Sequence, residues 1–284
     1  MDAPAITVTP VSGALGADVT GIDLSAPLSN TQWDSIHRAF LDHHVLRFNG
    51  QNVTPSQHED FAKRFGPIVP YPFGKGIEGH PDVLEIRKNP TDKRNFGGTW
   101  HSDTTYLPVP PLATMLVARE TPPIGGDTLF MNTHLAYEAL SNGMKAMLAN
   151  LKAFNSSNKR YRTGSRAAQL AADTGTALKD PEPGVQTEST HPVVRTHPET
   201  GRKSLYINRA HTINFDGWTE PESKPMLDYL FRHMERPDFQ CRMSWQEGTL
   251  IIWDNRSTQH FAADDYAGHT RVMHRVTIAG DMPV

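Results

Sequence analysis

The chain has one cysteine, no long apolar run and no signal-like start among its 284 residues. A single thiol, Cys241, excludes an intrachain disulfide framework and fits a reducing compartment. Because it alternates with Phe239 and Met243, we expect it to be buried and structural rather than nucleophilic. No apolar stretch approaches the roughly 18 residues that cross a bilayer, and the first residues lack the basic and apolar regions of a signal peptide. These absences predict a soluble, cytoplasmic protein without a membrane partner.

The charge is also unbiased, because 28 Lys and Arg residues oppose 31 Asp and Glu residues for a net charge of −3. No block of basic residues occurs, so nucleic acid and anionic membranes are not expected as partners. The length is ample for one sizeable core. No repeat or low-complexity segment divides it, and we expect one domain over residues 1–284. The 14 histidines motivate a search for metal ligands.

Hydrophobic patterning predicts many short strands and a few helices. Helical periodicity covers residues 30–44, 54–66, 133–151 and 223–236. Gly and Pro separate short β-like runs such as "VLRF", "DVLEIRK", "TMLVARE", "TLFMN", "TLIIWDN" and "RVMHRVTI". Without a regular alternation of strands and helices, a mainly β fold is favoured, a sandwich or jelly roll decorated by helices. The polar, Pro- and Gly-bearing stretch at about 155–190 is typical of a lid or excursion.

His-x-Asp, a spacing that can chelate a metal, occurs three times. Residues two apart share one face of a strand but lie about 200° apart around a helix. The pair at 58–60 falls in an expected helix and is excluded. The pair at 80–82 flanks a proline in an expected turn, whereas His101 and Asp103 lie in the Thr- and Tyr-rich run "WHSDTTY". That run has the best strand context, so His101 and Asp103 are the candidate chelate.

A second group of polar residues follows the apolar run "LIIWDN" near the C-terminal end of the sequence. His260 is expected in a polar bend, and a strand then carries Arg271 and Arg275 on one face, with Met273 between them. Two arginines that face a β-core need anionic partners, because an unpaired buried charge is very costly. This face therefore predicts an anion site near a candidate metal ligand.

Motifs in the same order make the sequence resemble the taurine dioxygenase (TauD/TfdA) family of Fe(II)- and 2-oxoglutarate-dependent oxygenases. They extend over nearly the whole chain and include "GALGADVTGIDLS", "VLRFNGQ", "FAKRFG", "WHSDTTY", "GGDTLF", "HPVVRTHPETGRKSLYIN", "WDNRSTQH" and "RVMHRVTIAGD". The resemblance implies a double-stranded β-helix, or jelly-roll, core. It also implies Fe(II), 2-oxoglutarate and O₂ as cofactor and cosubstrates, a small organic anion as substrate, and a homodimer or homotetramer.

The resemblance also assigns roles to residues. His101, Asp103 and His260 are the implied iron ligands, and a site with two His and one carboxylate leaves three metal positions open for cosubstrate and O₂. Arg271 and Thr128 are implied to bind the distal carboxylate of 2-oxoglutarate, which suits a planar guanidinium. From the residues alone, Thr128 would instead be a solvent-facing strand start.

The substrate pocket departs from that of the taurine enzyme. The arginine that matches Arg275 holds the sulfonate there, but the enzyme's pocket His and Asn are replaced here by "PIVPYPF" at 67–73 and by Gly97-Gly98. Tyr71, Phe73 and Asn208 are further pocket candidates. We expect a sulfonate, sulfate ester or carboxylate, such as an aryloxyalkanoate, that is larger than taurine.

Two other functions use the same ligands. A cupin-like metal-binding protein without oxygenase activity would have no reason to keep Arg271 eleven residues beyond His260. A zinc hydrolase would need a general base near the metal, and no motif places Glu120 or Glu138 there.

Overall fold

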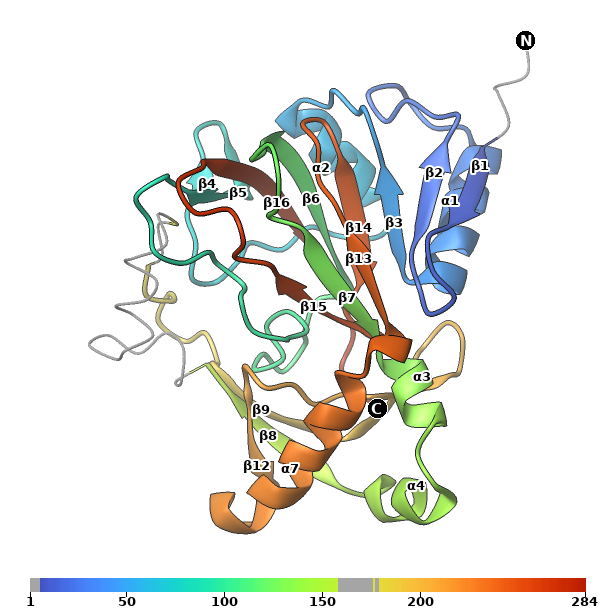
Figure 1. Cartoon of the computed structure of the whole chain (residues 1–284), viewed down its shortest axis with the longest axis vertical. Helices are drawn as coiled ribbons and strands as arrows, with labels where there is room; N and C mark the ends of the chain where they lie inside the picture. Colours follow the sequence, from blue (N-terminus) through green and yellow to red (C-terminus); the bar gives the residue numbers. More distant parts are fainter. Residues whose placement is uncertain (1–5, 158–175, 177–178) are drawn as a thin grey trace.

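The computed structural model describes residues 6–157, 176 and 179–284. Two β-sheets form its centre, with helices outside them and a smaller helix-and-sheet layer at one end (Figure 1). The larger sheet has the order β1-β2-β3-β14-β6-β16-β5-β4. Its strands, in that order, are Thr7–Pro10, Ala17–Thr20, Val45–Phe48, Leu250–Asp254, Ala113–Glu120, Arg271–Ile278, His80–Lys88 and Gly76–Ile77. The mainly β prediction is confirmed.

Alternating side chains give the larger sheet two apolar faces, since successive residues of a strand point to opposite sides. Leu46, Ile252 and Val276 pack on one face against α1 (Asn30–His43) and α2 (Pro55–Lys63). Both helices begin in capping boxes, formed by Ser29 and Thr54, which fix where each helix starts. The predicted helices at 30–44 and 54–66 are therefore confirmed to within a few residues.

The opposite face packs against a three-stranded sheet of order β13-β7-β15, in which β13 is Gln240–Met243, β7 is Thr128–Asn132 and β15 is Thr258–Ala262. Ile251, Leu116 and Met273 of the larger sheet meet Phe130 and Cys241 of the smaller one. Cys241 is buried as expected, and burial raises the pKa of its thiol to about 12. The two sheets therefore form a sandwich around a shared core.

A second core lies beneath the sandwich, where helices cover a three-stranded sheet of order β12-β8-β9 (Figure 1). The predicted helix at 133–151 is wrong in its continuity, because Ser141 caps a new helix. The late helix, α7, is close to the predicted 223–236. The elements of this layer are α3 (Thr133–Glu138), α4 (Asn142–Leu148), β8 (Lys152–Ser156), β9 (Glu188–Pro192), β10 (Val194–Thr196), β11 (Lys203–Leu205), β12 (Thr212–Phe215), α7 (Glu220–Met234) and η1 (Pro237–Phe239).

The stretch at 155–190 connects two neighbouring antiparallel strands, β8 and β9. Its ends are strand, so the predicted excursion is shorter, and residues 158–175 and 177–178 of it lie outside the described residues. The described part returns to the sandwich, since the Lys179 N–H donates to the Phe73 carbonyl over 2.8 Å and the Thr176 hydroxyl donates to the Arg87 carbonyl over 3.3 Å. No helix among the described residues has the length and apolarity to cross a membrane.

Candidate active site

Two backbone hydrogen bonds bring His101 against His260. The His260 N–H donates to the His101 carbonyl over 2.8 Å and the His101 N–H donates back over 3.1 Å. His260 lies within β15, so the expected polar bend is wrong. The expected strand for His101 and Asp103 is also wrong, because His101 forms only an isolated bridge and Asp103 begins a turn in which Thr104 has φ 42°. His101 and Asp103 are therefore positioned by the pairing of His101 with β15, and not by the alternation of side chains along a strand.

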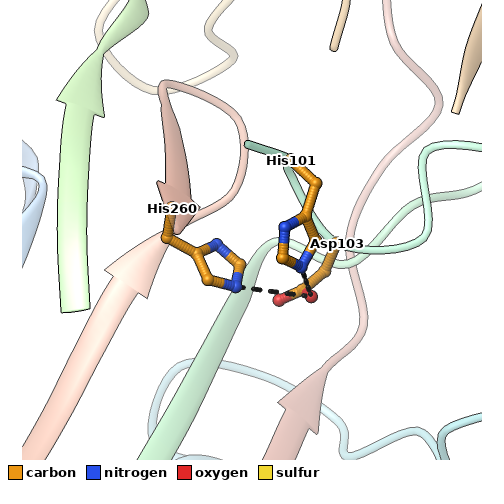
Figure 2. Close-up of side chains that lie close together, drawn as sticks. All are labelled: His101, Asp103 and His260. Atoms are coloured by element: carbon orange, nitrogen blue, oxygen red, sulfur yellow. Dashed lines mark ion pairs between the residues drawn. The ribbon is translucent and has the colours of Figure 1, made fainter. Parts of the chain in front are cut away.

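His101, Asp103 and His260 converge on one buried point (Figure 2). Asp103 Oδ1 lies 3.7 Å from Nε2 of His101 and 3.9 Å from Nε2 of His260. Metal bonds of about 2 Å allow donors on one ion to lie up to about 4 Å apart. The Asp103 oxygen is therefore close enough to each histidine nitrogen to share one small divalent cation, and all three donors lie within 4.8 Å of one another. His101 Nδ1 lies 2.7 Å from the Thr99 carbonyl, a contact that fixes the tautomer with Nε2 available to a metal. The described residues contain no other group of this kind.

The other two His-x-Asp pairs do not form such a site. His58 is fully buried in α2, and burial lowers the pKa of its imidazole to about 3. His80 begins β5 rather than lying in a turn, so that expectation is wrong, and its Nδ1 lies 3.2 Å from Glu59. Only the pair at 101–103 meets a third ligand.

Asp103 is held as a carboxylate by its surroundings. Burial by itself would raise its pKa, but the positive charge of Arg275 and the neighbouring histidines hold the pKa below its ordinary value. Arg275 Nη2 lies 3.1 Å from Oδ1, although its N–H is not aligned for a hydrogen bond. The Thr114 hydroxyl donates to Oδ2 over 2.7 Å. An ionised carboxylate at this position is the form that a metal requires.

A small cleft beside the three residues contains the predicted cosubstrate pair. Its walls include Leu116, Thr128, Trp253, His260, Arg271 and Arg275. Arg271 is buried, and Nε and Nη2 of its guanidinium have no hydrogen-bond partner among the described residues. Burial lowers the pKa of Arg271. Two unpaired donors in one plane suit a carboxylate, which binds an arginine in bidentate fashion.

Thr128 is buried in this cleft, so the solvent-facing alternative is wrong. Its hydroxyl accepts a hydrogen bond from Trp245 Nε1 over 3.0 Å. Because a hydroxyl has one proton to give as well as two lone pairs, Thr128 can still donate to an anion beside Arg271. Trp245 also lies under Arg271, with the guanidinium carbon 5.6 Å from the ring centroid. One tryptophan thus positions both residues of the predicted pair.

The turn before Thr128 explains the "GGDT" motif. Gly125 and Gly126 have φ of 84° and 72°, a region that only glycine adopts without strain. A side chain at Gly125 would meet Asp265 at 2.7 Å, and the Gly126 N–H donates to the Asp265 carboxylate over 2.7 Å. The close approach brings the loop between β15 and β16 against the turn that precedes β7 and Thr128.

An aromatic cluster lies beside Arg275. Its guanidinium carbon lies 5.0 Å from the ring centroid of Tyr71. Tyr71, Phe73 and Tyr106 belong to one buried cluster with Leu84. Arg275 and Arg271 both border the cleft, as the strand pattern predicted. The Arg275 guanidinium therefore lies between the candidate metal ligands and an apolar wall.

Asn208 differs from the other pocket candidates, since its side chain is engaged in the surrounding loop. Its Nδ2 donates to the Thr105 hydroxyl over 2.9 Å and its Oδ1 accepts from the His211 N–H over 2.9 Å. His211 is buried, and its ring meets that of His101 edge-on at 6.1 Å between centroids. His211 is not predicted from the sequence, because no periodic pattern places it near the candidate ligands.

Comparison with known proteins identifies the fold and the family. Residues 7–277 match the family model described as "Taurine catabolism dioxygenase TauD, TfdA family". The chain belongs to this family. It is 34% identical over 273 residues to an alkylsulfatase of Acinetobacter baylyi, which covers 96% of this chain and 84% of the relative. It is 33% identical over 285 residues to an alpha-ketoglutarate-dependent sulfate ester dioxygenase of Pseudomonas putida, covering 98% and 91%. A crystal structure of a taurine dioxygenase from Burkholderia xenovorans matches with a TM-score of 0.81 and 33% identity, over 99% of this chain and 91% of the other.

Family membership confirms the prediction of a 2-oxoglutarate-dependent dioxygenase with a jelly-roll core (alpha-ketoglutarate is 2-oxoglutarate). The two alternatives are not favoured. A zinc hydrolase would need a general base beside the metal, but Glu120 and Glu138 are both exposed, and Glu138 pairs with Arg202. A metal-binding protein without a cosubstrate would leave Nε and Nη2 of the buried Arg271 without a partner among the described residues, at a cost in free energy.

Proposed function

We propose that this dioxygenase binds Fe(II) through His101, Asp103 and His260 and 2-oxoglutarate through Arg271 and Thr128. The observation that carries the proposal is the buried Arg271 guanidinium in the cleft that the two histidines border, since its Nε and Nη2 have no hydrogen-bond partner in the part of the chain that the structure describes. With two histidines and one carboxylate as ligands, three metal positions are left for a bidentate cosubstrate and O₂. The net reaction converts 2-oxoglutarate, O₂ and a substrate C–H into succinate, CO₂ and a C–OH.

The iron, when bound, supplies the oxidative chemistry, and the residues of the chain orient the reactants. Arg271 and Thr128 fix the distal carboxylate, so the reacting end of 2-oxoglutarate is directed toward the three ligands. Thr99 holds the tautomer of His101, and Thr114 holds Asp103. The buried aromatic wall around Tyr71 excludes water from the place where the substrate C–H would lie.

For the substrate we propose a small organic anion with an apolar body, held at its charged end by Arg275. Two relatives are named for alkyl sulfate and sulfate ester chemistry, and both are aligned over nearly this whole chain. Tyr71 and Phe73 offer an apolar surface beside Arg275. Asn95, the asparagine nearest to the Gly97-Gly98 pair, donates its amide to the carbonyls of Ala262 and Ala263. The Asn95 side chain is therefore engaged by the backbone and does not take the place of the pocket asparagine of the taurine enzyme.

A hydroxyl placed on the carbon that carries a sulfate ester or sulfonate gives an unstable product, which collapses to a carbonyl compound and a released anion. The test is a panel of linear alkyl sulfates, alkyl sulfonates including taurine, and aryloxyalkanoates, with succinate formation as the readout. Alkyl sulfates or sulfonates with longer apolar chains should give more succinate than taurine. A preference for taurine over the whole panel would contradict the proposed pocket.

A further inference from the structure

Thr114 is a fully buried hydroxyl in the middle of the larger sheet. It lies in β6 beside Ala113 and Met115, both also fully buried, and opposite Trp253 of β14. A buried hydroxyl without a partner would destabilise this position. Thr114 has two side-chain partners, the candidate ligand Asp103 and the neighbouring Asn255.

The directions of the hydrogen bonds around Thr114 follow from its neighbour Asn255. The Asn255 Oδ1 accepts from the Asp103 N–H over 3.2 Å and from Trp253 Nε1 over 3.1 Å. Both partners are donors only, so this atom is the amide oxygen and the other is the NH₂. That NH₂ donates to Thr114 Oγ1 over 3.0 Å. The Thr114 proton is therefore available for Asp103 Oδ2, which lies 2.7 Å away.

This series of hydrogen bonds distinguishes the two carboxylate oxygens of Asp103. Thr114 holds Oδ2, whereas Oδ1 faces the Nε2 atoms of His101 and His260. Arg275 Nη2 is 3.1 Å from the same Oδ1. An arginine binds a carboxylate most strongly when it reaches both oxygens, and Thr114 occupies the second one. The Thr114 bond holds the carboxylate in the rotation in which Arg275 Nη2 lies near Oδ1.

We propose that Thr114, oriented by Asn255, is a positioning residue that keeps Asp103 Oδ1 directed at the metal and out of a bidentate pair with Arg275. The inference rests on the proposed function, because it assumes that Asp103 is a ligand. It also gives Asn255 of the "WDN" motif a function at the site, although its side chain lies behind the carboxylate.

The test uses Co(II), whose binding is followed by its visible absorption in titrations of the purified full-length chain. Thr114→Val keeps the shape and removes the hydroxyl, Thr114→Ser restores the hydroxyl, and Thr249→Val is the matched control. Thr249 is also fully buried, but its hydroxyl bonds Asn49 over 3.2 Å at the far end of β14. Loss of a residue that orients a metal ligand costs about 10–100-fold in affinity, so we expect the Co(II) dissociation constant of Thr114→Val to rise by that factor. The absorption of bound Co(II) should also change, since the geometry of one ligand changes.

Thr114→Ser should bind Co(II) nearly as the wild type does, and Thr249→Val should not differ from it. In addition, Arg275→Met should raise Co(II) affinity more in the Thr114→Val background than in the wild type, because there the competitor is unrestrained. Wild-type affinity and spectrum in Thr114→Val would overturn the inference. So would an equal loss in Thr249→Val, or equal gains from Arg275→Met in both backgrounds. A wild-type chain that binds no Co(II) would instead contradict the proposed function itself.

Discussion

Replacement of Arg271 by Ala tests the cosubstrate site most severely. The guanidinium is buried, its Nε and Nη2 have no partner among the described residues, and its position is fixed over Trp245. Each charge-assisted hydrogen bond is worth about 1.5–3 kcal/mol. Two of them, discounted because such contributions are not additive, give a loss of roughly 3 kcal/mol, and each 1.4 kcal/mol is a factor of ten. We therefore expect the affinity for 2-oxoglutarate to fall by about a hundredfold or more.

The assay is isothermal titration of the anaerobic Mn(II)-loaded protein with 2-oxoglutarate, which separates binding from turnover. Arg271→Lys should recover only part of the affinity, because an ammonium has no planar pair of donors. Arg242→Ala is the control, since Arg242 is exposed and pairs with Asp127 and Asp265 at the rim of the same region. It should change the affinity by less than about threefold. An unchanged dissociation constant in Arg271→Ala, with the protein folded and Mn(II) bound, would refute the assigned role.

Three further predictions concern the substrate, a buried ion pair and acid stability. Arg275→Ala should raise the KM for the anionic substrate at least tenfold while the dissociation constant of 2-oxoglutarate changes little; an unchanged KM would remove Arg275 from the substrate site. Asp254 is fully buried and accepts hydrogen bonds from both Arg256 and His197. Asp254→Asn should therefore lower the free energy of unfolding by about 3–5 kcal/mol, measured by urea denaturation. A loss under about 1 kcal/mol would contradict this prediction. Burial lowers the pKa of His58 to about 3 from an ordinary value of 6.5, so the unfolded chain binds the extra proton between these values. The free energy of unfolding should therefore fall on acidification from pH 6.5, by up to about 1.4 kcal/mol per pH unit from this group. His58→Phe should make the free energy of unfolding depend less steeply on pH in this range. The same pH dependence in both proteins would exclude His58 as a cause.

The sequence predicted most of the fold because its signals are local. "VLRF" and "TLFMN" are strands over the same residues as predicted, and Thr54 caps the predicted helix. The break between α3 and α4 at Ser141 is not predicted, because the apolar periodicity continues across it. Ser141 nevertheless caps the start of a new helix, α4. β8, β9, β12 and β15 are not predicted, because polar residues make up at least half of each strand and their partners in the sheets are distant in the sequence.

The candidate ligands were predicted for a partly incorrect reason. His101 and Asp103 were selected as neighbours on a strand face, but Asp103 lies in a turn, and the pair is completed by the bridge to His260. That bridge joins two residues that are far apart in the sequence, so no local pattern contains it. Thr114 and Asn255 were missed for the same reason, since their hydrogen bonds join residues 11 and 152 positions from Asp103. The oligomeric state and the cytoplasmic location stay predictions.

The most direct test of the account is the visible spectrum of the anaerobic protein with Fe(II) and 2-oxoglutarate. A bidentate 2-oxoglutarate on Fe(II) gives a weak charge-transfer band, which a zinc hydrolase or a simple metal-binding protein would not show. We expect this band in the wild type at one Fe(II) per chain, its loss in His101→Ala and His260→Ala, and unchanged circular dichroism in both variants. Fe(II) bound at full stoichiometry in both variants, or no band in a wild type that binds Fe(II) and 2-oxoglutarate, would contradict the account.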